Sequence, residues 1–274
     1  MPDPAVRDDR GDIFAGTAEY YARYRMDYPD QAYAEIERTF ALDGRGTLLD
    51  LGTGPGLIAL HLAHQFQRVV GLDVSAEMVE VARRLAEERA VTQASWHVLP
   101  AEELASIGDG PYRLVTMGSA FHWMDQPRVL DLTYDRTEPG GGVAILGMPG
   151  FMQIEDIPVG DRIAEVVAGV VQKHLGERRR AGSSFYAPPP KRWEEFLAES
   201  RYTEVESGMQ TFTVDFDADS VVGLLYSTSF ANRRLLGDRV EAFEADLRAA
   251  LRELDPSGRY PRTFTADWVF ARKR

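Results

Sequence analysis

The sequence has no cysteine, little lysine and no long apolar run. Without cysteine, disulfides, thiolate zinc sites and cysteine nucleophiles are excluded. No apolar run approaches the ~18 residues of a membrane span, and the start, Met1-Pro2-Asp3-Pro4, is charged and proline-rich where a signal peptide has an apolar core. We therefore expect a cytoplasmic protein without a membrane partner.

Positive charge is also scarce, because 31 basic side chains stand against 43 acidic ones and the formal net charge is −12. A molecule this acidic repels DNA and RNA, and no compact basic patch relieves the repulsion, so we expect no nucleic-acid partner. What the chain does have is 44% hydrophobic residues over 274 positions, enough to build a large globular core.

Short apolar runs alternate with helical patterns between Gly46 and Met148, which is typical of βαβ units on a parallel sheet. The pattern predicts a doubly wound α/β fold. The expected strands are Thr47–Leu51, Arg68–Asp73, Ser95–Leu99, Arg113–Met117 and Val143–Met148, and the expected helices between them include Leu57–Phe66 and Ala76–Arg89.

Outside this region the pattern changes. Phe14, Ala18, Tyr21, Arg25 and Tyr28 follow helical spacing, so we expect one helix that stops before Pro29. The later segments predict insertions and a return to the sheet: helix near Ile163–His174, a break at Pro188–Pro190, helix at Arg192–Glu199, strand at Gln210–Phe216, helices at Ser220–Tyr226 and Arg239–Leu254, and a last strand at Thr263–Ala271.

A glycine-rich turn ends the first strand and opens the next helix, where an α/β sheet binds ligands. Gly52, Gly54 and Gly56 allow a sharp turn and a close ligand. The nicotinamide fingerprint would place its third glycine at position 57, where this chain has Leu57, and no Gly-Lys-Ser/Thr ending of a P-loop follows. Dinucleotide and nucleotide-triphosphate binding are therefore disfavoured.

Two carboxylates accompany this turn. Asp50 precedes the glycines, where it would repel a pyrophosphate but suit a cationic amino group. Asp73 ends the second strand, 21 residues after Gly52, at the spacing where an acidic residue accepts hydrogen bonds from ribose hydroxyls. The pair predicts a nucleoside ligand that carries positive charge.

These residues resemble the class I S-adenosylmethionine-dependent methyltransferases over roughly Phe14 to Gly147. The resemblance rests on four segments: Leu-Asp-Leu-Gly-Thr-Gly-Pro-Gly at 49–56, Gly-Leu-Asp-Val-Ser-Ala-Glu-Met at 71–78, Ala101-Glu102, and Ser119-Ala120-Phe121-His122-Trp123. With the opening Phe14…Tyr21…Arg25…Tyr28-Pro29, it is most similar to the small-molecule branch that contains trans-aconitate methyltransferase-like proteins.

The resemblance implies S-adenosylmethionine as cofactor, released as S-adenosylhomocysteine. It implies that the glycine loop holds the methionine part, that Asp73 with the adjoining Val74 binds ribose, that Met78 packs on adenine, and that Ala101-Glu102 reads the adenine edge. Ser119 is expected to complete the set. Met78 as plain core, and Glu102 as an acid favoured at a helix start, remain open.

The pattern along the chain also suggests a domain organisation. Residues 1–35 would cover the cofactor, 36–149 would form the cofactor-binding core, 150–190 and 217–261 would form a helical cap for the acceptor, and 191–216 with 262–274 would complete the sheet. The cap carries apolar and aromatic residues such as Phe151, Met152 and Tyr226, which fit either an acceptor pocket or the core of the cap itself.

The residues that could act on an acceptor follow from their places at the sheet edge. His122 could be a general base or line the pocket with Trp123, and Tyr226 could contact the acceptor. Tyr21 and Arg25, four residues apart, could hold the cofactor carboxylate or an acidic substrate, or only cover the core. His61 and His64 have no evident third ligand, so we expect no metal.

We therefore expect metal-independent methyl transfer to a small molecule, most favourably on oxygen, with secondary metabolism as the expected setting. Transfer to carbon or nitrogen and a non-catalytic nucleoside-binding module remain alternatives. Nitrogen on a base or amide is disfavoured, because Gly118-Ser119-Ala120-Phe121 stands where an Asn-Pro-Pro-Tyr-like signature is expected. Sequence leaves the acceptor and the oligomeric state open.

Overall fold

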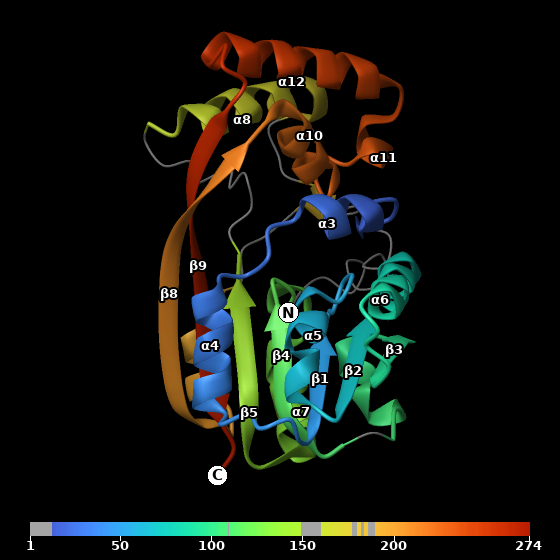
Figure 1. The fold of residues 1–274 in the computed structure, drawn as a ribbon, viewed down its shortest axis with the longest axis vertical. Coiled ribbons are helices and arrows are strands. Elements are labelled where there is room, and N and C mark those ends of the chain that lie inside the picture. The colour runs from blue at the N-terminus through green and yellow to red at the C-terminus, as the bar shows by residue number, and fades with distance from the viewer. Residues whose placement is uncertain (1–12, 109, 149–159, 177–179, 182–183, 186–189) are drawn as a thin grey trace.

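Seven strands form one mixed sheet in the computed structural model, which describes residues 13–108, 110–148, 160–176, 180–181, 184–185 and 190–274 (Figure 1). Their order is β3-β2-β1-β4-β5-β9-β8, and β9 runs antiparallel to both of its neighbours. The strands are β1 (Thr47–Leu51), β2 (Arg68–Asp73), β3 (Ala94–Val98), β4 (Tyr112–Gly118), β5 (Thr137–Gly147), β8 (Thr203–Phe216) and β9 (Tyr260–Arg272).

Both faces of the sheet are covered by helices, because the central strands carry apolar side chains on each side. Leu48 faces α4 (Asp30–Thr39) and α5 (Leu57–Leu62), whereas Leu49 faces α7 (Gln126–Arg136) and α9 (Trp193–Ala198). A further helix, α6 (Ala76–Glu88), packs on β2 and β3, and three 3₁₀ turns complete this half: η1 (Ala63–Gln65), η2 (Ala101–Ser106) and η3 (Phe121–Trp123). The predicted doubly wound α/β fold is confirmed.

The chain direction across the sheet reverses between β1 and β4. From β1 the order proceeds through β2 to β3, whereas β4 returns to the other side of β1. The carboxyl ends of β1 and β4 therefore flank a switch point, which is where open α/β sheets bind ligands. The glycine turn follows β1 and Ser119 follows β4, so both lie at this point.

A long two-stranded ribbon joins the sheet to a helical cap. β8 and β9 pair from Thr203↔Arg272 to Phe216↔Tyr260, and their far ends extend beyond the sheet to the cap helices (Figure 1). The cap consists of α8 (Arg162–Leu175), α10 (Ala218–Tyr226), α11 (Arg233–Leu236), η4 (Gly237–Arg239) and α12 (Val240–Leu254), which share one apolar core with the ribbon. A separate short ribbon pairs β6 (Arg180–Ala181) with β7 (Ser184–Phe185).

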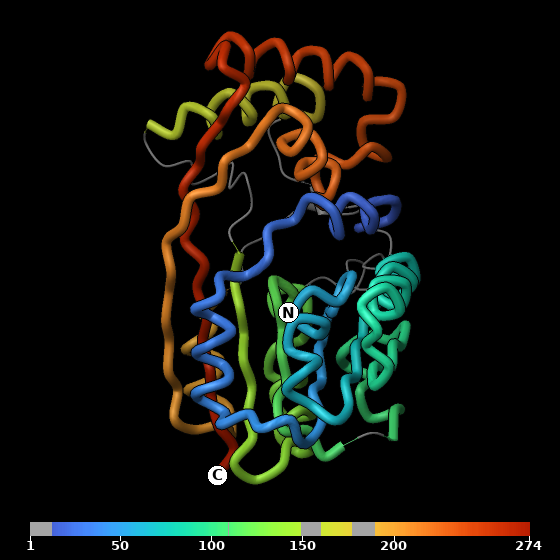
Figure 2. Tube along the Cα trace, in the orientation of Figure 1, coloured from blue at the N-terminus to red at the C-terminus, as the bar shows by residue number. Residues whose placement is uncertain are grey.

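The first described helix, α3 (Ala18–Tyr24), lies between the cap and the sheet (Figure 2). It is shorter than predicted, because the chain becomes extended at Arg25, with φ −69° and ψ 138°. The expectation that Tyr28 continues the helical stripe was wrong. Tyr28 precedes Pro29, which disfavours helical backbone, and its ring turns into the core between the sheet and α5.

Several strand boundaries differ from the predicted ones. β1 and β2 have the predicted bounds, but β5 begins six residues before Val143 and β8 begins seven before Gln210. β8 is the sheet edge and most of its first half is exposed, so its side chains there need no apolar alternation. In the described part of the chain, no helix combines the length and apolar character needed to cross a bilayer. Phe151 and Met152 lie outside the described residues.

Candidate active site

The glycine turn after β1 takes a backbone shape that ordinary residues avoid. Gly52, Gly54 and Gly56 have φ values of +64°, +54° and +84°. At Gly52 a Cβ would lie 2.5 Å from the Cβ of Ala120. No side chain fits at this position, so the close packing of the turn also requires glycine. At Gly54, the atom nearest to the Cβ position among the described residues is Tyr21 Cε1 at 4.0 Å, so no described side chain fills the space above the loop. The turn therefore presents bare backbone to the switch point.

Asp50 lies beneath this turn as a buried carboxylate, 2% exposed. Its Oδ2 accepts a hydrogen bond from Thr53 Oγ1 at 2.6 Å and its Oδ1 accepts one from Thr116 Oγ1 at 2.7 Å. Burial raises the pKa of Asp50 to about 6, although both hydroxyls favour the ionised form. A cation bound beside Asp50 would therefore stabilise the ionised carboxylate and offset the free-energy cost of burying it.

Asp73 at the end of β2 connects the turn to the next helix. Its Oδ2 accepts from the Gly54 amide and its Oδ1 from the Ser75 amide, each at 2.8 Å. Burial raises the pKa of Asp73, and the backbone amides of Ser75 and Gly54 act against that rise. The carboxylate is thus fixed at the edge of the turn, with its orientation set by two backbone donors.

A cavity opens above these groups at the carboxyl edge of the sheet. Met78 from α6, Leu99 after β3 and Ala101 from η2 line one side of it. Glu102 also lines it, but its Oε1 accepts the Asp125 amide at 2.9 Å, which ties this acid to the start of α7. The full lining is Ile13, Phe14, Tyr21, Gly52, Gly54, Asp73, Val74, Met78, Leu99, Ala101, Glu102, Gly118, Ser119, Ala120, Trp123 and Met124.

The first described residues of the chain cover this cavity. Ile13, Phe14 and Tyr21 line it from the side of α3, and the Phe14 ring meets Trp123 edge-on with centroids 6.2 Å apart. The Gly16 amide donates to Glu77 on α6 at 2.6 Å, which holds this cover against the sheet-bearing half. The cavity is therefore enclosed between the sheet edge and the N-terminal segment.

A second, smaller cavity adjoins the first and shares Tyr21, Gly52, Gly118 and Ser119 with it. It is lined further by Arg25, Met26, Tyr28, Asp50, Thr53, Leu57, Ile58 and Met148. The Arg25 guanidinium lies 4.8 Å from the Tyr21 ring, and its Nη2 donates to the Ser227 carbonyl at 3.4 Å. Its buried Nε has no hydrogen-bond partner among the described residues. This cavity thus combines one buried anion with one incompletely paired cation.

Tyr28 is a residue that sequence reasoning missed. Its hydroxyl and Ser119 Oγ are 3.0 Å apart, and Ser119 Oγ also accepts the Met148 amide at 3.2 Å. Ser119 has φ +50°, an uncommon conformation for a residue with a side chain. Only one of the two hydroxyl hydrogens is used in the bond between Tyr28 and Ser119. The second hydroxyl hydrogen can therefore point into the small cavity. Proline at position 29 was the signal that Tyr28 leaves the helix.

The residues predicted to contact an acceptor lie in different places. Trp123 lines the larger cavity, whereas His122 is half-buried beside it, with ring centroids 4.9 Å apart, and lines neither cavity. Tyr226 lies in the core of the cap, where its hydroxyl donates to Glu244 at 2.8 Å, so the structure does not bring it to either cavity. Gly56 opens α5 and meets Trp96 instead of the cavities.

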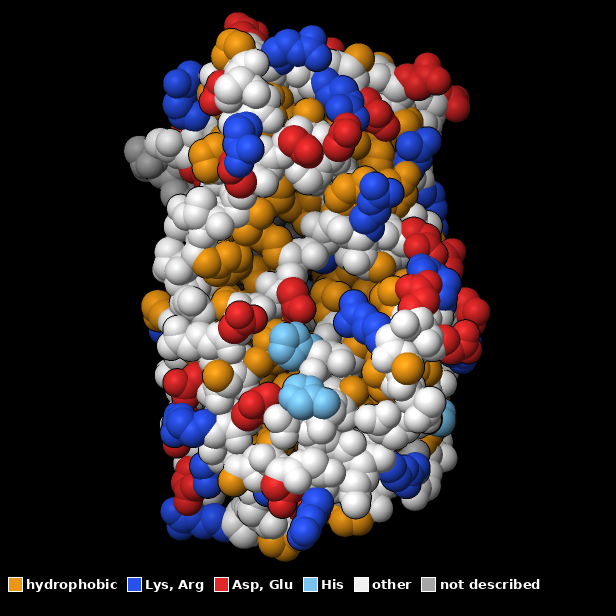
Figure 3. All heavy atoms as spheres, in the orientation of Figure 1, with side chains coloured by type: hydrophobic (Ala, Val, Ile, Leu, Met, Phe, Trp, Pro, Cys, Tyr) orange, Lys and Arg blue, Asp and Glu red, His pale blue; other side chains and the backbone are white. Residues whose placement is uncertain are grey.

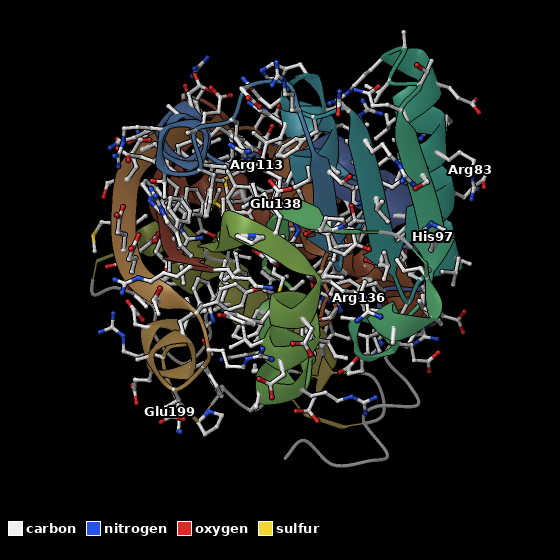
Figure 4. All side chains as sticks on the ribbon, turned by 90° about the horizontal axis from the view of Figure 1, so that it is seen from below. Arg83, His97, Arg113, Arg136, Glu138 and Glu199 are labelled. Carbon is white, nitrogen blue, oxygen red and sulfur yellow. The ribbon has the colours of Figure 1, made fainter. Side chains whose placement is uncertain are left out.

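Two further groups of side chains lie away from the cavities: a histidine pair and an ion pair. His64 is exposed, whereas His61 is half-buried, stacks on the Tyr33 ring and has its Nδ1 3.5 Å from Asp27 Oδ2. The described residues contain no group of three His, Asp or Glu side chains arranged to hold a metal. At the opposite end of the sheet, Arg113 and Glu138 point toward one another and pair at 3.4 Å (Figure 4).

Comparison with known proteins places this site in a class. Residues 48–141 match the family model of a methyltransferase domain. A Dictyostelium discoideum protein that carries a methyltransferase name is 24% identical over 213 residues, covering 78% of this chain and 71% of that protein. The ubiquinone biosynthesis O-methyltransferase of Acinetobacter baylyi is 33% identical over 97 residues, covering 35% of this chain and 41% of that enzyme.

The fold has solved counterparts. The Haemonchus contortus phosphoethanolamine N-methyltransferase 2 in complex with S-adenosyl-L-methionine superposes with a TM-score of 0.56 at 16% identity, covering 99% of this chain and 60% of that chain. This likeness concerns the fold. The matched domain over residues 48–141 and the methyltransferase-named relatives indicate an S-adenosylmethionine-dependent methyltransferase, with S-adenosylmethionine as its cofactor.

Proposed function

We propose that this enzyme transfers a methyl group from S-adenosylmethionine to a small-molecule acceptor, most favourably to an oxygen atom. The observation that carries the proposal is the pair of adjoining cavities at the switch point, one lined by Asp73 and apolar side chains, the other by Asp50 and Arg25. The cofactor has the same division, with an uncharged nucleoside at one end and a zwitterionic amino acid at the other.

The larger cavity suits the adenosine part. Asp73 stands where it can accept hydrogen bonds from ribose hydroxyls, and Met78, Leu99 and Ala101 offer apolar surface to a flat base. Open space above Gly54 lets the backbone approach the ligand closely. Val74 and Glu102 also line this cavity, and we propose that they contact the cofactor.

The smaller cavity suits the amino-acid part. Asp50 would accept the ammonium group, and Arg25 would bind the carboxylate through guanidinium donors that the described residues leave incompletely used. Tyr21 and Ser119 line both cavities and so stand where the two parts of the cofactor join. The sulfonium between those parts supplies an already activated methyl group, so the protein has to align the acceptor and exclude water.

The acceptor side of the proposal rests on the cap. Apolar side chains are exposed where the cap meets the sheet-bearing half on the face that Figure 3 shows, and Trp123 and Met148 line the cavities. Such surfaces suit an apolar or aromatic small molecule. The O-methyltransferase among the relatives also favours oxygen as the methylated atom. We further propose that the enzyme is cytoplasmic, acts without a metal and has no nucleic-acid partner.

The test has two stages. Calorimetry with S-adenosylhomocysteine and with NAD should show binding of the first alone, and binding of NAD with no binding of S-adenosylhomocysteine would contradict the proposal. A panel of phenols, aliphatic alcohols, carboxylic acids, amines and short RNAs is then incubated with cofactor, and mass spectrometry scores the gain of one methyl group. Methylation confined to amines or RNA would replace the oxygen and small-molecule proposals.

A further inference from the structure

The helix α3 contacts both halves of the molecule. Toward the sheet-bearing half, Nη2 of Arg84 on α6 donates to both carboxylate oxygens of Glu19, at 2.8 and 3.0 Å. Toward the cap, the Tyr20 ring meets the Tyr226 ring edge-on, with centroids 5.3 Å apart. Figures 1 and 2 show α3 in this bridging place.

One contact between α3 and the cap depends on a missing side chain. Gly223 lies in the middle of α10, and a Cβ there would be 2.3 Å from Tyr24 Cδ2 and 2.4 Å from Tyr24 Cγ. These are the atoms at the base of the ring, so the whole side chain would have to move. Glycine inside a helix costs about 1 kcal/mol relative to alanine. Gly223 has no positive φ to explain that cost, whereas the Tyr24 contact does explain it.

Two residues that line the smaller cavity, one in α3 and one at its C-cap, are next to this contact. Tyr24 immediately precedes Arg25, and Tyr21 is three residues earlier. On the cap side, the Ser227 amide donates to the Gly223 carbonyl, and the Ser227 carbonyl in turn accepts from Arg25. The two helices therefore meet at consecutive points, first at Gly223 with Tyr24 and then at Ser227 with Arg25.

We propose that Gly223 and Tyr24 are positioning residues, through which the cap fixes Tyr21 and Arg25 over the amino-acid end of the cofactor. The inference rests on the proposed role of Arg25. It assigns the cap a part in cofactor affinity, in addition to any part in acceptor recognition.

The experiment compares Gly223→Ala with Gly169→Ala. Gly169 lies inside α8, and no described residue comes within 4 Å of its Cβ position. Both changes therefore replace a helix-interior glycine, but only Gly223→Ala displaces Tyr24. The probes are S-adenosylhomocysteine and 5′-methylthioadenosine, which lacks the amino-acid group. We expect Gly223→Ala to weaken S-adenosylhomocysteine about tenfold, to weaken 5′-methylthioadenosine far less, and Gly169→Ala to leave both unchanged. Equal affinities of the two glycine variants would overturn the proposal.

A double-mutant cycle tests the contact itself. Tyr24→Ala should produce the same selective loss, and adding Gly223→Ala to it should cause no further loss, because the clashing ring is gone. Independent, multiplying effects would count against the contact. Should Gly223→Ala lose its cooperative thermal transition, Tyr24→Ala alone still decides, since an equal loss for both probes overturns the proposal.

The proposed function fails by a different result. Wild-type protein that does not bind S-adenosylhomocysteine contradicts the function. Wild-type protein that binds it, with Arg25→Met selectively weakened and Gly223→Ala not, contradicts the positioning role alone.

Discussion

Asp50 shows at the scale of one residue how function and stability oppose each other. Its carboxylate is buried under the glycine turn, where burial raises its pKa to about 6. Thr53 and Thr116 satisfy its oxygens with neutral hydroxyls, but no cation is within hydrogen-bond reach among its described partners. The protein keeps this charge where a cationic ligand would balance it.

Replacing Asp50 by asparagine should stabilise the protein at neutral pH. The folded state binds the proton more tightly than the unfolded state, whose pKa is about 3.9, so the stability contributed by protonated Asp50 is present below ~4 and is lost as pH rises through about 6. Asp50→Asn should therefore gain up to roughly 3 kcal/mol at pH 8 and little at pH 4. Urea unfolding of both proteins across pH measures the difference.

The control is Asp238→Asn, because Asp238 is an acid exposed to solvent. It should change stability little at either pH. The same Asp50→Asn protein should lose most of its affinity for S-adenosylhomocysteine, so a variant that is more stable and binds normally would contradict the role proposed for Asp50.

Asp73 should contribute to affinity both directly and through the turn. Asp73→Ala removes the predicted ribose contacts and also the acceptor of the Gly54 and Ser75 amides. We expect S-adenosylhomocysteine to bind about ten- to hundredfold more weakly, which corresponds to roughly 1.5–3 kcal/mol. Calorimetry measures this, and unchanged affinity in a folded variant would exclude Asp73 from the site.

His122 lines neither cavity, and this favours a supporting role over proton transfer. His122→Ala should keep most of its single-turnover rate at saturating acceptor. A general base would instead give a rate that rises with pH near 6–7, and its loss would slow the step by on the order of 10²–10⁴. Rates of both proteins across pH separate the two roles, and disappearance of such a limb in the variant would restore His122 as the base.

At the scale of elements, the glycine turn can be tested against another glycine with positive φ elsewhere in the chain. Gly54 and Gly258 both have positive φ, +54° and +74°, and the Cβ positions of both are open. Gly54→Ala and Gly258→Ala should each lose about 1 kcal/mol of stability, because alanine tolerates this backbone poorly. Only Gly54→Ala should also weaken cofactor binding, as calorimetry would show. Equal affinities would mean that the ligand does not approach this backbone.

The end of α10 shows that polar residues in the cap can serve the helices themselves. The side chains of Ser227 and Asn232 bond to nearby backbone groups. Ser227 Oγ donates to the Leu224 carbonyl at 2.5 Å, and Asn232 caps α11 by accepting the Leu235 amide at 3.0 Å. Such residues are frequent at helix ends because they bond locally, and spacing alone does not distinguish this from ligand binding.

At the scale of the whole molecule, charge distribution bears on the class of acceptor. The net charge of −12 repels polyanions, and acidic and basic side chains are interspersed on the face in Figure 3. We expect a fluorescent single-stranded RNA to show no binding by anisotropy at low ionic strength, where electrostatic attraction would be strongest. Binding that weakens steeply with added salt would contradict the exclusion of nucleic acid.

The alternating pattern of the chain determined the sheet-bearing half. Thr47–Leu51 and Arg68–Asp73 have the bounds that their apolar runs predicted, because buried parallel strands need continuous apolar residues. The glycine turn and Asp73 were predictable for a related reason. Both contribute through backbone shape and position next to a strand end, and these are local properties of the sequence.

Tertiary structure alone decided what closes the site. Tyr28 meets Ser119 across 91 positions and Arg25 meets Ser227 across 202, so no spacing along the chain could reveal either contact. The strand order is likewise nonlocal, since β9, the last strand in the chain, lies between β5 and β8. The cap helices α10, α11 and α12 connect β8 to β9. A sequence determines the local backbone preference and which face of each helix or strand is apolar. Which of these faces pack together depends on the tertiary structure, because every apolar face has to be buried in the same fold.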